Sequence, residues 1–416
     1  MVPDLTSSQE RRANLVVMLT ADRQIDRRIL LEADSLGTAG WEVIILGMPL
    51  DPGQADVDPR VRRVGEAAVA AAQDNFIMGA YRFLRRCLPM NGFLMRGMKS
   101  FAWRYLFDQE NFFVRLFAGS AFRYSPKIFV AHDLPMLPVA RQAAERCGAK
   151  LVYDSHELYS EQEFSRQEKQ RWAEIEAKHV GACDAVITVN PSIATELEHR
   201  HGLQRVHVVY NAERLQRGLT RQWRFHERFG LASGVKVLLF QGGLSAGRNI
   251  EALVEAFGAI QNSMTHLVIM GDGQLRARLK AIADHARCAD KVHFHPAVSQ
   301  HDLLDFTASA DAGVIPYQAT CLNNRYCTPN KLFEFIAAGV PILASNLPEI
   351  ERIVSTYSIG MVGDLSTSRS IASIVDEFFC DGARMQKWRT NAEEARSAIC
   401  WEREGSKIVE IFEALK

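Results

Sequence analysis

The sequence lacks long hydrophobic runs, closely spaced cysteine pairs and an excess of either charge. It contains no 18 consecutive apolar residues, so no segment is predicted to cross a bilayer as a helix. Its eight cysteines form no C-x-x-C pair and no cluster with histidines, which argues against a zinc site and a disulfide framework. The first residues show no apolar signal region before a small-residue cleavage site. We therefore expect a cytoplasmic protein whose membrane contact, if any, is peripheral.

The charge balance limits the partners of the chain. Its 49 Lys and Arg residues are matched by 49 Asp and Glu residues, which gives a formal net charge of zero. Sequence-independent nucleic-acid binding requires a strongly cationic surface, so no nucleic-acid partner is expected. The length of 416 residues exceeds the roughly 250 to 300 residues at which one hydrophobic core stops growing, which predicts two or three domains.

The second half of the chain alternates short aliphatic runs with amphipathic stretches, the pattern of βαβ units. Strands are expected at residues 235–240, 266–270, 292–295, 312–317 and 342–345, and helices at residues 249–260, 274–286, 301–308 and 330–338. The last helix is predicted to have Thr328 as its N-cap, Pro329 at its first position and Gly339 after its end.

The first half repeats this pattern. Strands are expected at residues 15–19, 42–46, 128–131, 150–154 and 185–189, and helices at residues 26–38, at 138–146 and within 167–180. A polar, arginine-rich connection near residues 211–231 separates the halves. Two doubly wound α/β domains bind ligands at the carboxyl ends of their strands, so a cleft between the domains is the predicted site.

Residues 76–124 interrupt the alternation with a basic and aromatic segment. Its basic residues are Arg82, Arg85, Arg86, Arg96, Lys99, Arg104, Arg115 and Arg123, and its aromatic residues include Phe83, Phe93, Phe101, Trp103, Phe107, Phe112, Phe113 and Phe117. Such helices can lie in the headgroup layer of an anionic membrane. The alternative is a helical insertion packed on the sheet, which we favour because aromatic residues at helical spacing are usually buried.

The helix predicted at residues 330–338 has the groups of a nucleotide site. Its first amides carry a partial positive charge that suits a phosphate, and Lys331 adds a full charge. Glu334 lies three residues further on the same face, where a carboxylate can accept hydrogen bonds from both hydroxyls of a ribose. The alternative is a simple Lys–Glu pair on a helix surface, worth about 0.2 to 0.5 kcal/mol.

Two glycine-rich turns complete the donor-side candidates. In FQGGLSAGRNIE, Gly242 and Gly243 allow an anion to approach the backbone, and Arg248 offers a bidentate fork for phosphate oxygens. The second turn, MGDGQLR, superficially matches a dinucleotide fingerprint. It follows the second strand of its domain and has Arg276 where a third glycine is required, so an NAD site is disfavoured.

These motifs, in this order, resemble the retaining glycosyltransferases of family 4, which have the GT-B architecture of two Rossmann-like domains. The resemblance extends over most of the chain, through ADRQIDRRILLEADSLGTAGWEVIIL, HDLPMLPVA, LVYDSHELYSE, DAVITVNPSIA, GGLSAGRNIEALVEA, MGDGQLRARL and TPNKLFEFIAAGVPILAS. It implies an acceptor-binding domain over residues 1–212 that contains the insertion at about 76–124, a nucleotide-sugar domain over residues 213–392, and a closing helix over residues 393–416 that packs on the first domain.

The resemblance also implies roles for individual residues. Glu334 matches the second glutamate of the family's E-x7-E motif, Arg248 the cation beside the donor diphosphate, and His156 the histidine near the transferred sugar. With Lys331, these are the expected catalytic residues. The expected donor-binding residues are Gly242, Gly243, Gly271, Asp272, Gly273, Asn330 and Tyr326. The acceptor-side candidates are Asp26, Arg28, Asp133 and Glu157, whose alternative roles are helix capping and interstrand pairing.

Two positions depart from the family pattern. Tyr326 stands where the first glutamate of E-x7-E is expected, and Gly243 where many members have a second basic residue. The expected function is transfer of a sugar from a nucleoside-diphosphate sugar to a glycan or lipid-linked acceptor, without metal or cofactor, because Arg248, Lys331 and helix amides can stabilise the leaving diphosphate. The alternatives are a GT-B nucleotide-sugar epimerase and a catalytically degenerate scaffold that binds nucleotide or glycan.

Overall fold

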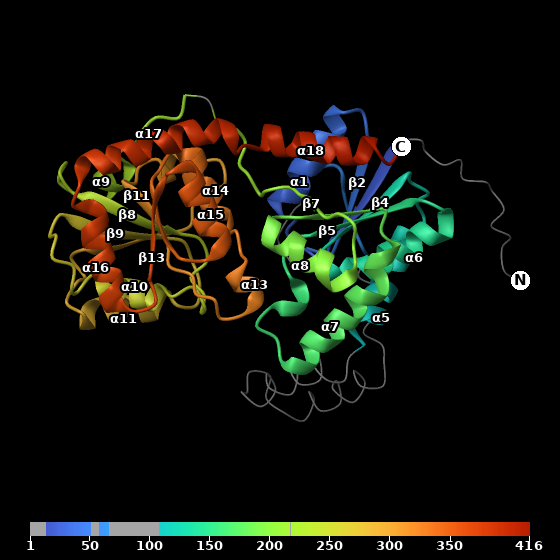
Figure 1. Ribbon diagram of the computed structural model, residues 1–416, viewed down its shortest axis with the longest axis horizontal. Helices are drawn as coiled ribbons and strands as arrows, with labels where there is room; N and C mark the ends of the chain where they lie inside the picture. The colour runs from blue at the N-terminus through green and yellow to red at the C-terminus, as the bar shows by residue number, and fades with distance from the viewer. Residues whose placement is uncertain (1–13, 51–57, 66–107, 217) are drawn as a thin grey trace, which may run out of the picture. The chain divides into compact units, whose positions relative to one another are not determined.

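The computed structural model describes residues 14–50, 58–65, 108–216 and 218–416. The chain forms two compact units (Figure 1). Unit 1 comprises residues up to 209 together with residues 405–416, and unit 2 comprises residues 210–404. The chain therefore re-enters unit 1 within its last helix, after Glu404, whereas the sequence suggested a closing helix from residue 393. The difference arises because residues 393–398 belong to a helix, α17, that packs on α14 of unit 2.

Unit 1 contains a parallel sheet with the strand order β3-β2-β1-β4-β5-β6-β7. Its strands are β1 (Leu15–Leu19), β2 (Glu42–Gly47), β3 (Val61–Arg63), β4 (Ile128–His132), β5 (Lys150–Ser155), β6 (Ala185–Thr188) and β7 (His207–Val208). Its helices are α1 (Arg27–Thr38), α5 (Gln109–Ala121), α6 (Leu137–Cys147), α7 (Arg166–His179), α8 (Pro191–His201) and the part of α18 (Trp401–Glu413) that follows Glu404. The strand order reverses direction between β1 and β4, which is where a doubly wound sheet offers a ligand site.

Unit 2 contains a second parallel sheet with the order β10-β9-β8-β11-β12-β13. Its strands are β8 (Lys236–Gln241), β9 (Thr265–Met270), β10 (Val292–His295), β11 (Ala312–Ile315), β12 (Ile342–Ser345) and β13 (Gly360–Gly363). Its helices are α9 (Arg224–Phe229), α10 (Ile250–Ala256), α11 (Arg276–His285), α12 (Leu303–Thr307), α13 (Leu322–Arg325), α14 (Asn330–Ala338), α15 (Pro348–Tyr357), α16 (Ser368–Phe379) and α17 (Gly382–Ala398). Here the order reverses between β8 and β11.

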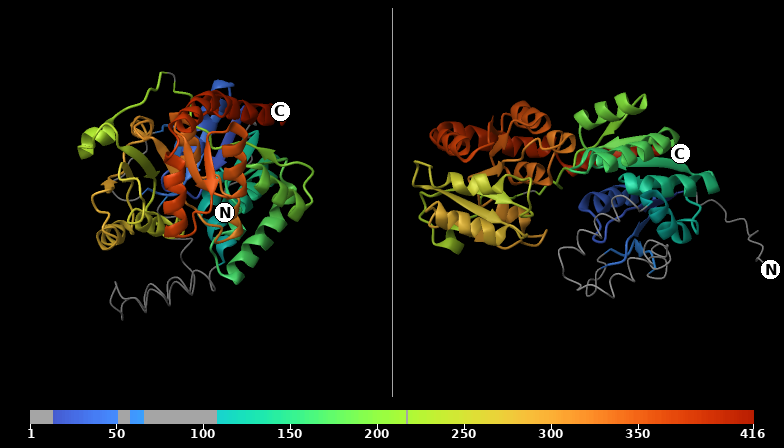
Figure 2. Two further views of the ribbon diagram at one scale, coloured as in Figure 1. Left: turned by 60° about the vertical axis from the view of Figure 1, so that its left-hand side comes forward. Right: turned by 90° about the horizontal axis from the view of Figure 1, so that it is seen from below.

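The sheet of unit 2 has an apolar core on each face, which is why its central strands are rich in aliphatic residues. One core packs residues of α14, α15 and α17 on the sheet, and the other packs residues of α10, α11 and α16 on the opposite face. Figure 2 shows, for each unit taken by itself, strands enclosed by helices. The prediction of two doubly wound α/β domains is therefore confirmed.

The start of α14 differs from the sequence prediction. Pro329 is the N-cap, not the first helical residue, and no side chain caps the first turn, so the prediction of Thr328 as N-cap is wrong. The extended backbone of Pro329, with ψ at 145°, leaves Thr328 one residue too far from the first amides to cap them. Gly339 ends the helix in the left-handed conformation, with φ at 64°, as predicted.

Most of the basic aromatic segment, residues 76–107, lies outside the described residues. The described part forms α5, in which Phe112, Phe113 and Phe117 are buried. This helix packs against α6. The burial of these three aromatic residues agrees with the packing interpretation, and packing of the segment on the sheet stays a prediction.

Candidate active site

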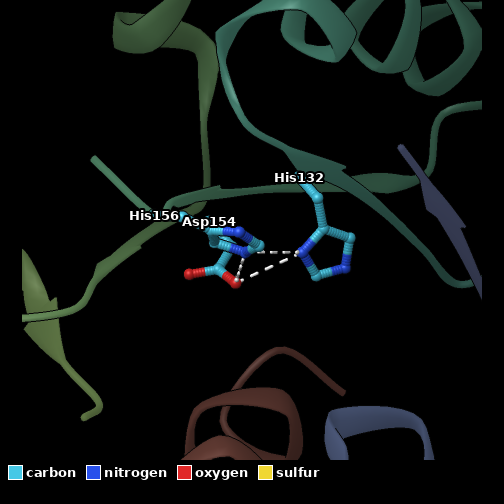
Figure 3. A group of neighbouring side chains, drawn as sticks. All are labelled: His132, Asp154 and His156. Atoms are coloured by element: carbon cyan, nitrogen blue, oxygen red, sulfur yellow. Dashed lines mark hydrogen bonds and ion pairs between the residues drawn. The ribbon is translucent and has the colours of Figure 1, made fainter. Parts of the chain in front are cut away.

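The carboxyl ends of β4 and β5 bring two histidines and an aspartate together (Figure 3). His132 ends β4, Asp154 pairs with it in the sheet register, and His156 follows β5. The Asp154 Oδ2 atom lies 2.9 Å from His156 Nε2 and 3.2 Å from His132 Nδ1, and the two ring nitrogens are 3.3 Å apart. The parallel register thus places a charged cluster at the edge where unit 1 is expected to bind its ligand.

Arg28 of α1 binds the same carboxylate. Its Nε donates to Asp154 Oδ2 and its Nη2 to Oδ1, each over 3.0 Å, and its Nη1 donates to the carbonyl of Val209 over 2.8 Å. Arg28 is 2% exposed and Asp154 is fully buried. Burial alone would raise the pKa of Asp154, but Arg28 and His156 hold it well below its usual range. Asp154 is therefore an ionised anchor for one guanidinium and two imidazole rings.

His156 lies between two carboxylates. Its Nδ1 is 3.5 Å from Asp133 Oδ2, and its backbone N–H donates to Asp133 Oδ1 over 3.0 Å. Burial disfavours the charged ring, but Asp133 and Asp154 outweigh it and raise the pKa of His156 to about 10. With both ring nitrogens facing carboxylates, His156 is a cation at neutral pH, so it can donate hydrogen bonds but cannot act as a base.

Asp133 has a strained backbone. Its φ of 62° and ψ of 162° lie in a region that non-glycine residues rarely adopt, at a cost of about 1–3 kcal/mol. The Asp133 N–H donates to the Asp154 carbonyl over 3.0 Å, and this bond helps to hold the conformation. Strain of this kind concentrates at functional sites, which supports Asp133 as a site residue.

Among the described residues, one group has ligand atoms close enough together to hold a metal ion. It consists of His132, Asp154 and His156. Two imidazole nitrogens and a carboxylate oxygen would suit zinc. However, the ligand atoms already bond to one another, and the Arg28 guanidinium on Asp154 would repel a cation. The residues present therefore fit a hydrogen-bonded charge cluster better than a metal centre.

The other acceptor-side candidates have structural contacts of their own. Asp26 caps α1 by accepting a hydrogen bond from the Arg28 backbone N–H over 2.7 Å. Glu157 accepts a hydrogen bond from the Gln162 side chain. These contacts and the buried Arg28–Asp154 pair agree with the capping and pairing alternative, and an acceptor role for Asp26, Arg28 and Glu157 stays a prediction.

In unit 2, the loops that follow β8 and β9 lie directly against each other. A Cβ atom on Gly271 would lie 2.0 Å from the Gly242 carbonyl oxygen, and one on Gly273 would lie 2.3 Å from the Leu244 carbonyl oxygen. Asp272 joins these loops to the next one, because its carbonyl accepts from Leu244 N–H over 2.9 Å and its carboxylate from Ala297 N–H over 3.1 Å. Gly271 and Gly273, two of the glycines predicted to line a nucleotide, are thus required by the close packing of the loops.

Lys331 lies beside the first of these loops. Its Nζ atom is 3.8 Å from the centre of the Phe240 ring and 5.0 Å from that of Tyr317, and it has no hydrogen-bond partner among the described residues. The side chain is 5% exposed. A Cβ atom on Gly242 would lie 3.5 Å from this Nζ and 3.7 Å from Arg248 Nη1. Burial and the nearby Arg248 lower the pKa of Lys331 well below its usual range.

Glu334 is held by a short chain of polar side chains. Its carboxylate accepts a hydrogen bond from Gln241 Nε2, and Gln241 Oε1 accepts one from Thr307 Oγ1 over 2.9 Å. Because a carboxylate only accepts hydrogen bonds, the Gln241 amide nitrogen faces Glu334, and its oxygen faces the Thr307 hydroxyl. Gln241, the last residue of β8, therefore orients the predicted ribose-binding carboxylate.

The structure places the remaining donor-side candidates around this loop. Arg248 Nη1 donates to the Gly243 carbonyl over 3.0 Å, and its guanidinium lies 5.7 Å from the centre of the Tyr317 ring. Asn330 begins α14 and accepts a hydrogen bond from Asn211 over 3.4 Å. Tyr326 follows α13. The structure thus brings Gly242, Gly243, Arg248, Lys331 and Glu334 together at the β8–β11 reversal, and donor roles for Asn330 and Tyr326 stay predictions.

Comparisons with known proteins agree with this architecture. Residues 221–395 match the family model for glycosyl transferases group 1, and residues 25–212 match the glycosyl transferase 4-like domain. A curated relative, the D-inositol 3-phosphate glycosyltransferase of Xylanimonas cellulosilytica, is 23% identical over 255 residues, which are 57% of this chain and 58% of that protein. The alignment thus spans less than two thirds of the length of the relative.

Solved structures of low sequence identity share the fold. A sucrose-phosphate synthase from Thermosynechococcus elongatus superposes with a TM-score of 0.74 at 16% identity, covering 97% of this chain and 99% of the other. The Anabaena protein HepE, solved in complex with UDP-glucose, superposes with a TM-score of 0.70 at 14% identity, covering 96% and 99% of the two chains. In the described part of this chain, no helix combines the length and the apolar character needed to span a membrane.

Proposed function

Because this chain belongs to the group 1 glycosyltransferases and has the GT-B fold, we propose that it transfers a sugar from a nucleoside-diphosphate sugar to a glycan or lipid-linked acceptor, with retention of anomeric configuration. This would be a step in the biosynthesis of a cell-surface polysaccharide or glycoconjugate. The proposal goes beyond the family match, which supports glycosyl transfer without defining the donor, the acceptor or the stereochemistry.

The observation that carries the proposal is the meeting of the β8 loop with the start of α14. Lys331 and Arg248 both lie next to the space above Gly242, and no side chain caps the first turn of α14. A helix start with two adjacent cations suits a diphosphate. Glu334, held by Gln241, would accept hydrogen bonds from the ribose hydroxyls of the same nucleotide. One structural neighbour, HepE, binds UDP-glucose.

The chemistry follows from these groups. In the transfer step, the bond between the anomeric carbon and the diphosphate oxygen breaks, and its electron pair goes to the diphosphate. The acceptor hydroxyl oxygen bonds to the same carbon, and its proton goes to the departing phosphate oxygen. Arg248, Lys331 and the α14 amides would stabilise the negative charge that develops on the leaving group. These cations can neutralise the diphosphate, so the proposed reaction uses no metal, and activity should survive treatment with EDTA.

Unit 1 would bind the acceptor and the transferred sugar. His156, cationic between Asp133 and Asp154, would donate a hydrogen bond to the sugar or to the acceptor. Asp133, whose pKa is raised to about 7 by burial against the opposing effect of His156, is the nearest group that can exchange a proton near neutral pH. A cleft that joins this cluster to the nucleotide site stays a prediction.

We also propose that the acceptor is linked to a lipid and that transfer takes place at the inner face of the plasma membrane. It rests on the basic and aromatic composition of residues 76–124. Co-sedimentation with liposomes that contain or lack anionic lipid tests it. Equal amounts of protein in the supernatant with both kinds of liposome would remove membrane contact from the proposal.

The main test is a thermal-shift screen with UDP-, GDP-, ADP- and TDP-sugars, followed by incubation of the stabilising donor with candidate acceptors. The expected product has the anomeric configuration of the donor, as determined by NMR. An inverted product would refute retention. Conversion of the donor to an epimer without acceptor would instead favour the epimerase, and donor binding without turnover against a broad acceptor set would favour the degenerate scaffold.

A further inference from the structure

The amino group of Lys331 occupies an environment that does not suit a charged lysine. The ring faces of Phe240 and Tyr317 attract a cation, but the amino group is almost fully buried and has no hydrogen-bond partner among the described residues. An ammonium group has three N–H donors, and leaving them unsatisfied in a buried site is costly. Without an anion beside it, this environment favours the neutral amine, which has two weaker N–H donors in place of three strong ones.

The charged neighbours of Lys331 act in opposite directions. Arg248, from the β8 loop, repels a positive charge at Nζ. On α14 itself, Glu334, whose carboxylate accepts from Gln241, favours the charged form, but burial and Arg248 outweigh it and lower the pKa of Lys331. Cys327, before α14, and Tyr317, after β11, are the other titratable groups that face the site. Burial raises the pKa of Cys327 and of Tyr317 to about 12, so both are neutral at pH 7 and offer no counter-charge.

A diphosphate would reverse this balance. The space above Gly242 lies next to both Lys331 Nζ and Arg248 Nη1, so an anion placed there faces both groups at once. Its negative charge would offset the repulsion by Arg248, and its oxygens would accept the unsatisfied N–H groups of Lys331. We propose that Lys331 is uncharged in the empty protein and takes up one proton when a nucleoside diphosphate binds beside it. This inference rests on the proposed donor site.

The proposed switch gives Lys331 a role that fixed cations cannot have. Arg248 is charged at every accessible pH, and two permanent cations in this apolar pocket would repel each other in the empty protein. A lysine that gains its charge only with the ligand avoids this repulsion and still neutralises the diphosphate. Gly243 stands where many family members have a second basic residue, and Lys331 would supply that charge.

The direction of the pH dependence follows from proton uptake. If binding takes up a proton, the affinity for the nucleotide falls as pH rises above the pKa of Lys331 in the empty protein. The terminal phosphate of a nucleoside diphosphate has a pKa of about 6, so at pH 8 it is ionised both free and bound. Proton uptake at pH 8 must therefore come from the protein.

Isothermal titration of the full chain with UDP, GDP, ADP and TDP at pH 8 tests the proposal. The titration is repeated in HEPES and Tris buffers, which carry no phosphate to compete for the site and whose different ionisation enthalpies report the number of protons exchanged. We expect uptake of about one proton with the nucleotide that binds. The Lys331→Met variant, which keeps the apolar stem, should take up none and bind at least tenfold more weakly.

The Lys331→Arg variant is the matched control, because it provides a permanent charge. It should bind the nucleotide without proton uptake. Binding by the wild type with no proton uptake, or uptake that persists in Lys331→Met, would overturn the inference. If none of the four nucleotides binds the wild type, the proposed donor site itself is wrong. If Lys331→Met fails to fold, the proposal is tested by the affinity of the wild type for the nucleotide between pH 7 and 9.5. An affinity that does not change with pH over this range is incompatible with proton uptake.

Discussion

Arg28 on α1 and Asp154 on β5 form a buried, bidentate ion pair in which both N···O distances are 3.0 Å. The pair connects the first helix of unit 1 to the strand that positions His132 and His156. Arg28 also contacts Glu32, at 2.9 Å. Burial and the neighbouring Asp154 raise the pKa of Glu32 well above its usual range, against the opposing effect of Arg28.

Replacing Arg28 by Met should destabilise the protein strongly. The change leaves Asp154 ionised and buried without its main partner, which typically costs about 3–5 kcal/mol. Arg60→Met is the matched control, since Arg60 pairs with Asp34 and Asp58 at a partly exposed position where the loss should be about 0–1 kcal/mol. Urea unfolding followed by circular dichroism compares them. Equal effects of the two substitutions would show that the buried pair contributes no more than a surface pair.

Gly271→Ala should disrupt the nucleotide loops. The added Cβ would lie 2.0 Å from the Gly242 carbonyl oxygen, a backbone atom that cannot rotate away. We expect a loss of about 1–3 kcal/mol or more in stability, together with weaker nucleotide binding. Gly37→Ala on α1 is the control, because a Cβ there meets nothing within 4 Å, and it should stabilise the helix by about 0.5–1 kcal/mol. Differential scanning calorimetry and nucleotide titration measure both effects, and unchanged binding by Gly271→Ala would contradict the close-packed arrangement.

Glu334→Ala should weaken nucleotide binding by roughly 1.5–3 kcal/mol, because it removes a charged hydrogen-bond acceptor for the ribose. Gln241→Leu should reproduce part of this loss, since it leaves the Glu334 carboxylate without the amide that orients it. Glu351→Ala, on the exposed face of α15, serves as the control. A 2′,3′-dideoxynucleotide should bind wild type and Glu334→Ala equally. If it still distinguishes them, Glu334 does not act through the ribose hydroxyls.

The free energy of unfolding should decrease in mild acid, because folding lowers the pKa of His293. It stacks on Phe229 with ring centres 4.8 Å apart and lies 2.9 Å from His266 through their ring nitrogens. Burial and His266 lower its pKa to about 4, against the opposing effect of Asp290, whereas an unfolded histidine has a pKa of about 6.5. A pKa lowered by folding gives stability that is complete above pH 6.5 and is lost as pH falls toward 4.

His293→Phe keeps the stacking and removes the titration. The drop in thermal midpoint between pH 7 and pH 5 should therefore be smaller in this variant than in the wild type. His301→Phe makes the same change at an almost fully exposed position and should behave like the wild type. An identical drop in all three proteins would mean that His293 does not titrate differently on folding.

The sequence predicts strands with a clear apolar pattern well and short polar or glycine-rich strands poorly. The bounds of the central strand β1 and of the edge strand β10 agree with prediction, at Leu15–Leu19 and Val292–His295, since these strands read as a continuous apolar run and an alternating run. The other three edge strands, β3, β7 and β13, have the sequences VRR, HV and GMVG and were not predicted. They are short and contain polar residues or glycine, so only their pairing in the sheet defines them.

In the candidate sites too, residues in local motifs can be predicted from the sequence, whereas residues brought together by strand pairing cannot. Lys331, Glu334 and the glycine turns can be recognised because each lies in a local motif whose spacing has a physical meaning. His132, Asp154, Gln241 and Tyr317 were not identified as site residues, because their importance depends on strand register. Asp154 is opposite His132 in the pairing of β4 with β5, and Gln241 reaches Glu334 only because β8 ends beside α14. A search for polar residues at the last position of each predicted strand, or one residue beyond it, would have found Asp154 and His132.

The return of the chain to unit 1 has a consequence for biogenesis. Trp41 packs edge-on against Phe412, and its indole N–H donates to Glu413 over 3.0 Å. Residues 1–209 leave the ribosome long before this partner is synthesised, so during translation the first unit has an unfilled hydrophobic position. Unit 1 can therefore make this contact only after the whole of unit 2 has been synthesised.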